Sequence, residues 1–160
     1  MGSMHTLTVL GDDHLRPLLA AFTPDRPTLV LAVCAPPPQP EPWLSAPAAA
    51  LRARTHDGLL GAAAAYHGFV TAHAHQPTAC VLTVMADPGA ADPLGRSLLD
   101  GVVVMEQLLR RHHPRVRWLC VRHRGLTAPR LAPLLCSLLH HADLPFSAHP
   151  ILLDPESQPG

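Results

Sequence analysis

The chain has 160 residues, of which 48% are apolar and only 15% are charged. This length fits one globular domain that can bury a full core, but little charge remains to cover its surface. The 12 basic residues balance the 12 acidic ones, so binding to a nucleic acid through charge is excluded. A protein partner is the expected kind of ligand.

The termini and the cysteines indicate the cellular location that we expect for the chain. No apolar run reaches the ~20 residues that a membrane-spanning helix requires, and residues 1–5 do not have the pattern of a signal peptide. Residues 1–3 are interpreted as a cloning remnant and 156–160 as a flexible tail, which leaves 4–155 as a single domain. The four cysteines show no Cys-x-x-Cys spacing, so we expect reduced thiols and a cytoplasmic location.

The first part of the chain alternates between strand and helix patterns. Two short apolar runs, 6–10 (TLTVL) and 28–35 (TLVLAVCA), predict buried strands. A helix between them is predicted to begin at Asp12 or Asp13 and to stop before Pro24. The proline cluster at 36–42 is too rigid for a strand or a helix and predicts a loop.

The alternation continues to the end of the chain. An alanine-rich stretch with glycines predicts helix with a break, and it is followed by a strand, a strong helix, a strand, a helix and a last strand. These segments span residues 46–75, 79–85, 94–111, 116–122, 128–141 and 151–153. This order predicts an α/β fold, a Rossmann-like three-layer sandwich with a mostly parallel sheet. Whether the first strand lies at the sheet edge or at its centre stays open.

The ligand crevice of such a sheet lies at the carboxyl ends of its strands. The turn after the first strand carries Asp12 and Asp13, whose carboxylates would repel a pyrophosphate, so no dinucleotide cofactor is expected. Asp87, Asp92 and His123 follow later strands and are the best acid–base candidates, with turn and helix-cap roles as the alternative.

The 12 histidines do not have the spacing of a metal site. His73 and His75 lie two residues apart, which places them on different sides of a helix, and the other close pairs are adjacent residues at helix ends. We therefore expect no metal.

The order of several motifs resembles the short-chain dehydrogenase/reductase family from about residue 28 to 155. Four segments are similar to the strand ending in Asn-Asn-Ala-Gly, the helix with Asn-x-x-Gly, the serine-bearing strand and the Tyr-x-x-x-Lys helix. They are residues 32–36, 58–61, 81–89 and 94–111. Residues 119–125 and 146–155 resemble the Val-Asn-x-x-x-Pro-Gly turn and the closing segment. The resemblance implies a family fold truncated at its N-terminus, without the glycine-rich loop.

The resemblance also implies that the catalytic groups are missing. Met85 or Ala86 stands where the family's serine would be, and Gly95 and Leu99 take the places of its tyrosine and lysine. The chain has no lysine and only one tyrosine, Tyr66, which is predicted to pack with its hydroxyl at the edge of the core. Independent oxidoreductase activity is not expected.

The helix at 94–111 is apolar on nearly every side, which favours burial against both the sheet and a partner. In the family this helix and the preceding one form a four-helix dimer interface. The predicted interface residues are Gly58, Gly61, Leu94, Leu98, Val102, Met105 and Leu109.

Together these features predict a non-catalytic subunit that assembles with itself or with a full-length catalytic reductase, in acyl or polyketide-type metabolism. The alternative is an enzyme of another class, an isomerase, dehydratase or hydrolase that uses the former substrate crevice through Asp87, Asp92 or His123.

Overall fold

A computed structural model of the chain describes residues 5–10, 16, 26–34, 47–87, 92–140 and 150–154. These residues form one five-stranded sheet in which all neighbouring strands are parallel, in the order β1-β2-β3-β4-β5. The strands are β1 His5–Leu10, β2 Thr28–Cys34, β3 Cys80–Ala86, β4 Arg117–His123 and β5 Ile151–Leu153. The described helices are α2 Ala48–Arg54, α3 His56–His73, α4 Pro93–His112 and α5 Ala128–His140.

The three central strands are buried on both faces, as expected for near-continuous apolar runs in a parallel sheet. Their register aligns Thr28 with Cys80 and Cys80 with Arg117, so they begin and end together. β1 pairs with β2 alone among the described strands, which settles the open question about the first strand by placing it at the sheet edge.

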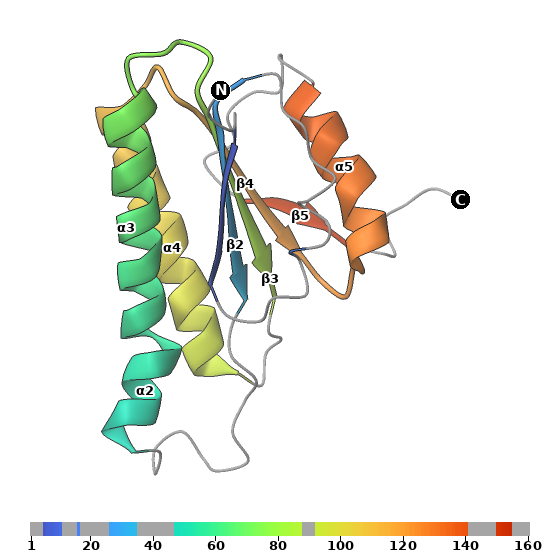
Figure 1. Cartoon of the computed structure of the whole chain (residues 1–160). Coiled ribbons are helices and arrows are strands. Elements are labelled where there is room, and N and C mark those ends of the chain that lie inside the picture. The colour runs from blue at the N-terminus through green and yellow to red at the C-terminus, as the bar shows by residue number, and fades with distance from the viewer. Residues whose placement is uncertain are drawn as a thin grey trace.

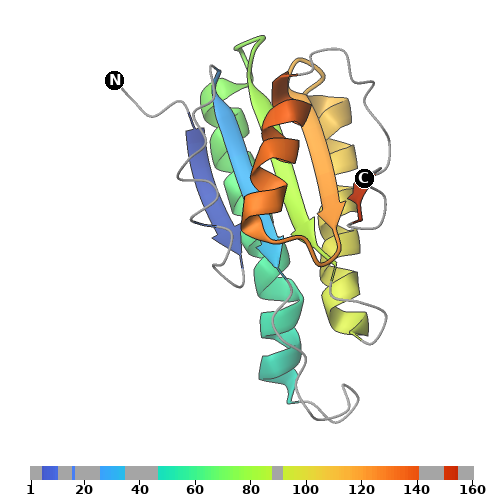
Figure 2. The same cartoon turned by 90° about the vertical axis from the view of Figure 1, so that its right-hand side faces the viewer.

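Helices cover the sheet on both faces, which confirms the predicted Rossmann-like three-layer sandwich (Figure 1). α3 and α4 pack on one face over a core that includes Leu31 and Trp118. α5 packs on the opposite face over Leu82 and Val121, and Figure 2 shows it in front of the sheet with α3 and α4 behind.

The alanine-rich helical stretch is interrupted, as predicted, and the interruption lies at Thr55 between α2 and α3. The Thr55 backbone (φ −128°, ψ −68°) leaves the helical region, and its hydroxyl donates to the carbonyl oxygen of Leu51 at 2.8 Å. A threonine that satisfies a carbonyl one turn earlier can replace a helical hydrogen bond and so permits this break.

The predicted strands and helices agree with the described elements to within a few residues. Several predictions lie outside the described residues: the helix start at Asp12 or Asp13, the proline loop at 36–42, the remnant at 1–3 and the tail at 156–160.

Candidate functional site

The carboxyl edge of the sheet gathers charged side chains from three strands. Asp87 follows β3, Arg124 follows β4 and Asp154 follows β5. Main-chain hydrogen bonds fix these ends side by side: the Asp87 N–H donates to the carbonyl of His123 at 2.9 Å, and the Arg124 N–H donates to the carbonyl of Leu153 at 3.1 Å. The parallel register thus brings residues from distant parts of the sequence to one edge.

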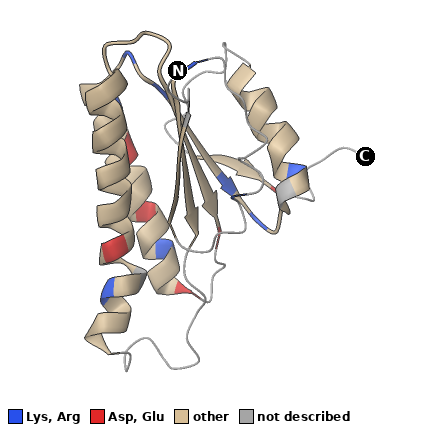
Figure 3. Ribbon diagram, viewed as in Figure 1, with Lys and Arg blue, Asp and Glu red and all other residues tan. Residues whose placement is uncertain are grey.

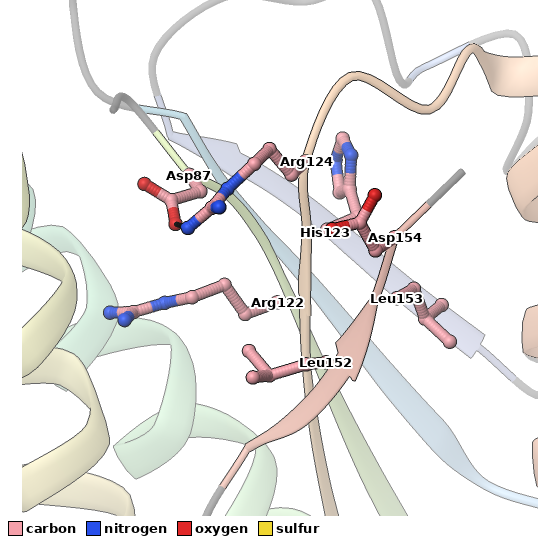
Figure 4. Close-up of a pocket in the computed structure, with 7 residues that line it drawn as sticks. All are labelled: Asp87, Arg122, His123, Arg124, Leu152, Leu153 and Asp154. Atoms are coloured by element: carbon pink, nitrogen blue, oxygen red, sulfur yellow. Dashed lines mark hydrogen bonds and ion pairs between the residues drawn. The ribbon is translucent and has the colours of Figure 1, made fainter. Parts of the chain in front are cut away.

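A pocket of about 80 Å³ opens at this edge (Figure 4). Its lining residues are Asp87, Arg122, His123, Arg124, Leu152, Leu153 and Asp154. This volume admits a few water molecules or one small polar group, and it is well below the size of a cofactor pocket.

Two ion pairs organise the charges of this pocket. The Arg124 guanidinium donates to a carboxylate oxygen of Asp87 at 3.0 Å, with the arginine 70% exposed and the aspartate side chain almost buried. Arg122 donates to Asp100 of α4 at 3.0 Å. The hydrogen bond and the charge of Asp87 raise the pKa of Arg124, so the guanidinium keeps its charge and neutralises that carboxylate.

The structure brings two of the three acid–base candidates to this pocket, because Asp87 and His123 line it and Asp92 does not. Asp87 and His123 nevertheless lie on opposite sides of β4 in Figure 4. The buried Asp92 side chain accepts a hydrogen bond from the Gly95 N–H at 3.1 Å at the start of α4, so it caps that helix, which is the alternative role given for it above.

The residues that stand at the expected serine, tyrosine and lysine positions carry no group that can move a proton. Met85 and Leu99 are fully buried apolar side chains, and Ala86 and Gly95 have no functional group. Tyr66 is also fully buried, and its hydroxyl lies 2.7 Å from the hydroxyl of Thr83. The prediction of a hydroxyl at the edge of the core is therefore wrong, because Thr83 supplies a polar partner inside it.

The predicted interface stripe packs inside this chain. Leu98 and Val102 belong to the core beneath α3 and α4, and Met105 and Leu109 pack against the same core. Leu94 is half-buried at the first turn of α4.

The two predicted interface glycines receive side chains of this chain as well. A Cβ at Gly58 would lie 2.7 Å from a methyl carbon of Leu98, and one at Gly61 would lie 2.8 Å from a methyl carbon of Leu10. These glycines therefore allow α3 to approach α4 and β1.

The apolar residues that point outward from the α3 and α4 layer are different ones. Leu60 of α3 and Val104 and Leu108 of α4 are 56%, 55% and 51% exposed. We call these three residues the outer face. Its signal was present in the sequence, since α4 is apolar on more sides than one sheet can cover, but the periodicity alone did not show which side faces inward.

Exposed charges lie at the margin of the outer face, at Asp57, Asp100 and Arg111, each three or four residues from an outer-face residue. Figure 3 shows α3 almost without charged residues; Asp57 in its first turn is the single Asp, Glu, Lys or Arg of that helix. Between residues 101 and 109 of α4 the single charged residue is Glu106, which is buried on the opposite side of the helix.

Within the described residues, no group of three or more His, Cys, Asp or Glu side chains could hold a metal ion. Among the helices in this part of the chain, none combines the length and the apolarity that a membrane crossing demands.

Comparison with known proteins gives no match among family models, curated proteins or solved structures.

Proposed function

We propose that the chain is a non-catalytic subunit with a reductase-like scaffold that assembles through the outer face. The observation that carries the proposal is that Leu60, Val104 and Leu108 are each more than half exposed on two neighbouring helices. Large apolar side chains exposed on neighbouring helices, with charged residues at their margin, mark protein interaction surfaces.

The scaffold supports the reductase part of the proposal. The α3 and α4 crossovers lie on one face of the parallel sheet and α5 lies on the other, around strands whose carboxyl ends form a shallow charged edge. The motif positions at Ala86, Gly95 and Leu99 cannot hold a ketone oxygen or donate a proton to it, which supports a role without reductase chemistry. The metabolic class, acyl or polyketide-type substrates, follows from the resemblance alone.

A second copy of this chain is the proposed occupant of the outer face. A two-fold axis between two copies would place the same helix pair against itself, so every apolar residue finds an apolar counterpart. The formal net charge of zero means that identical copies do not repel one another. A heteromer with a catalytic reductase is the other outcome that the test distinguishes.

Analytical ultracentrifugation of the full chain over a range of concentrations tests the proposal. We expect a dimer at micromolar concentration, and we expect the double substitution Val104→Glu/Leu108→Glu to give a monomer, because burying two carboxylates in an apolar contact is costly. Leu152→Glu is the control for a glutamate at an exposed leucine, since Leu152 is 72% exposed on the edge strand β5 and is not part of the outer face.

A monomer at all concentrations would contradict self-assembly. Co-elution of that monomer with a co-expressed full-length reductase, lost in the Val104→Glu/Leu108→Glu variant, would assign the same face to a heteromer. Equal dimerisation of the wild type and the double variant would contradict the outer face as the site of assembly.

The pocket beside Asp87 favours a second candidate function, acid–base chemistry of the isomerase, dehydratase or hydrolase kind. Asp87 has a nearly buried carboxylate, which pairs with the exposed guanidinium of Arg124. Turnover that Asp87→Ala abolishes while circular dichroism shows an intact fold would establish this function, and unchanged turnover would exclude Asp87 from it.

A further inference from the structure

A cluster of polar side chains lies inside the molecule, between the sheet and the α3 and α4 layer. Tyr66 comes from α3, Thr83 from β3 and Glu106 from α4, and we call these residues the buried triad. Tyr66 and Thr83 are fully buried and Glu106 is 2% exposed. An acid is rarely so buried unless it is paired or neutral, so the protonation state of Glu106 is important for the packing of all three elements.

Hydrogen bonds join the triad in a chain. The Tyr66 hydroxyl oxygen lies 2.7 Å from Thr83 Oγ1 and 3.4 Å from Glu106 Oε2. The other carboxyl oxygen, Oε1, accepts from Arg110 at 3.3 Å, and the same guanidinium nitrogen donates to the carbonyl of Trp118 at 3.2 Å. Arg110 is half-buried and thus connects the triad with the solvent side of α4.

The other titratable groups that face Glu106 keep their charge state near neutral pH. Burial raises the pKa of the Tyr66 phenol, and burial together with the Glu106 charge raises the pKa of the Cys120 thiol of β4. Burial also raises the pKa of the Cys80 thiol of β3 to about 11, with a smaller contribution from Glu106. The cation that faces Glu106 is Arg110, whose guanidinium nitrogen lies 3.3 Å from the carboxyl oxygen.

Glu106 is the member of the triad that changes charge in the physiological range. Burial raises the pKa of its carboxyl to about 7, although the nearby hydroxyls of Thr83 and Tyr66 and the guanidinium of Arg110 act in the opposite direction. Its neutral and ionised forms need different hydrogen-bond arrangements, because an ionised carboxylate only accepts and a carboxylic acid also donates.

The two arrangements differ in what the Tyr66 hydroxyl does. When Glu106 is ionised, Tyr66 donates to the carboxylate and accepts from Thr83. When Glu106 is protonated, its O–H donates to the Tyr66 oxygen, and Tyr66 donates to Thr83. Only the second arrangement joins α4, α3 and β3 through an uncharged carboxyl group, and the Arg110 guanidinium beside it then faces no carboxylate charge.

We propose that the buried triad is a proton-operated clamp that holds α3 and α4 tightly on the sheet when Glu106 is protonated and loosens them when it ionises. The geometry that carries this proposal is a fully enclosed acid with a hydroxyl pair whose donor direction can reverse. The clamp does not depend on assembly through the outer face, because Tyr66, Thr83 and Glu106 all lie inside one chain.

Nuclear magnetic resonance of the full chain labelled with tyrosine at the ring carbon that bears the hydroxyl tests the clamp. Tyr66 is the only tyrosine, so a single resonance reports on its hydrogen bonding. We expect one step in its chemical shift between pH 5 and pH 8.5, and we expect Glu106→Gln to abolish that step. A flat wild-type profile, or a step that persists in Glu106→Gln, would overturn the proposal.

Two arginine variants keep the proposal testable if Glu106→Gln does not fold. Arg110→Met leaves the carboxyl in place but removes its cation, so the midpoint of the step is expected to move to higher pH by about one unit. Arg111→Met is the matched control: this neighbouring arginine is exposed, and the midpoint should stay in place. Equal midpoints in the two variants would contradict the assignment to Glu106.

Amide hydrogen exchange measures whether the titration loosens the helices. Above the midpoint, exchange in α4, corrected for the intrinsic effect of pH, is expected to be several-fold faster than below it, whereas exchange in α5 on the opposite face should not change. Unchanged protection of α4 across the step would mean that the triad titrates without acting as a clamp, and it would overturn the proposal.

Discussion

Leu98 of α4 occupies the space that a side chain at position 58 of α3 would need. A Cβ built on Gly58 would lie 2.7 Å from one methyl carbon of Leu98 and 3.0 Å from the other. Leu98 is itself 2% exposed against the sheet, so it has little room to move. The distance between the two parallel crossover helices is therefore set by a glycine, and the same contact keeps Leu98 in the core.

Gly58→Ala is expected to destabilise the chain despite the better helix propensity of alanine. Overpacking a filled site costs about 1–3 kcal/mol, and replacing a helical glycine by alanine returns about 1 kcal/mol. We expect a net loss of about 1 kcal/mol in the free energy of unfolding, measured by urea denaturation.

Gly68→Ala, in the same helix, is the matched control. Gly68 is exposed and nothing lies within 4 Å of a Cβ placed there, so only the helix propensity acts and stability should rise by about 0.5–1 kcal/mol. Equal effects of the two substitutions would mean that Leu98 yields freely and that the glycine does not set the helix distance.

The ionisation of Glu106 makes the stability of the chain depend on pH. Folding raises the pKa of this carboxyl from 4.5 to about 7, so the folded state binds more protons than the unfolded state between these two values. The contribution of the neutral carboxyl is complete below pH 4.5 and is lost as pH rises through 7. Its size is on the order of 3 kcal/mol by linkage.

Urea denaturation at pH 5 and at pH 8 checks this sign. The wild type is expected to lose stability between the two values, and Glu106→Gln, which cannot ionise, is expected to lose much less. The opposite result would be a wild type that gains stability between pH 5 and pH 8 relative to Glu106→Gln. It would show that Arg110 stabilises the ionised carboxylate more than burial destabilises it.

Asp92 supports the start of α4, where Pro93 occupies the first helical position. Its carboxylate accepts from the Gly95 N–H, so Asp92→Ala is expected to cost about 1 kcal/mol in thermal or urea denaturation. Asp92→Asn keeps an oxygen acceptor and should stay within about 0.5 kcal/mol of the wild type. A large loss in Asp92→Asn would indicate that the negative charge, and not the cap, is what this position needs.

The sequence pattern was sufficient to predict the helices and strands, but not to predict which side of α4 faces the sheet. Alternating strand and helix patterns identify a parallel α/β sheet because each apolar run has its own period and its own breakers. The side of α4 that faces the sheet could not be chosen, since Leu98 and Val104 are equally apolar; the inward position of Leu98 depends on Gly58, which is distant in sequence.

The positions of the polar residues could also be predicted only in part from the sequence. Asp87 and His123 could be placed at the carboxyl edge because the sequence pattern shows where each strand ends. Their positions on opposite sides of β4 depend on the pleat and the register of the strands. In the sequence Glu106 only interrupts an apolar helix, and no neighbouring residue indicates that it is buried. Its burial arises from Tyr66 and Thr83, which the fold brings from two other elements.

Pro133 is an exposed proline inside α5. A proline at this position has no N–H to donate to the carbonyl four residues earlier, and its ring clashes with that carbonyl, which costs an interior helix up to about 3 kcal/mol. Pro133→Ala is therefore expected to stabilise the chain by about 1–2 kcal/mol in urea denaturation, part of the gain being offset by a freer unfolded chain.

Pro129→Ala is the control for this prediction, because Pro129 lies in the first turn of α5. The carbonyl of Thr127 accepts from Arg130 and Leu131 there, and a first-turn residue needs no N–H partner within the helix. This substitution should change the free energy of unfolding by less than about 1 kcal/mol and without a gain. A stabilisation equal to that of Pro133→Ala would assign both effects to general helix propensity and not to the missing hydrogen bond in α5.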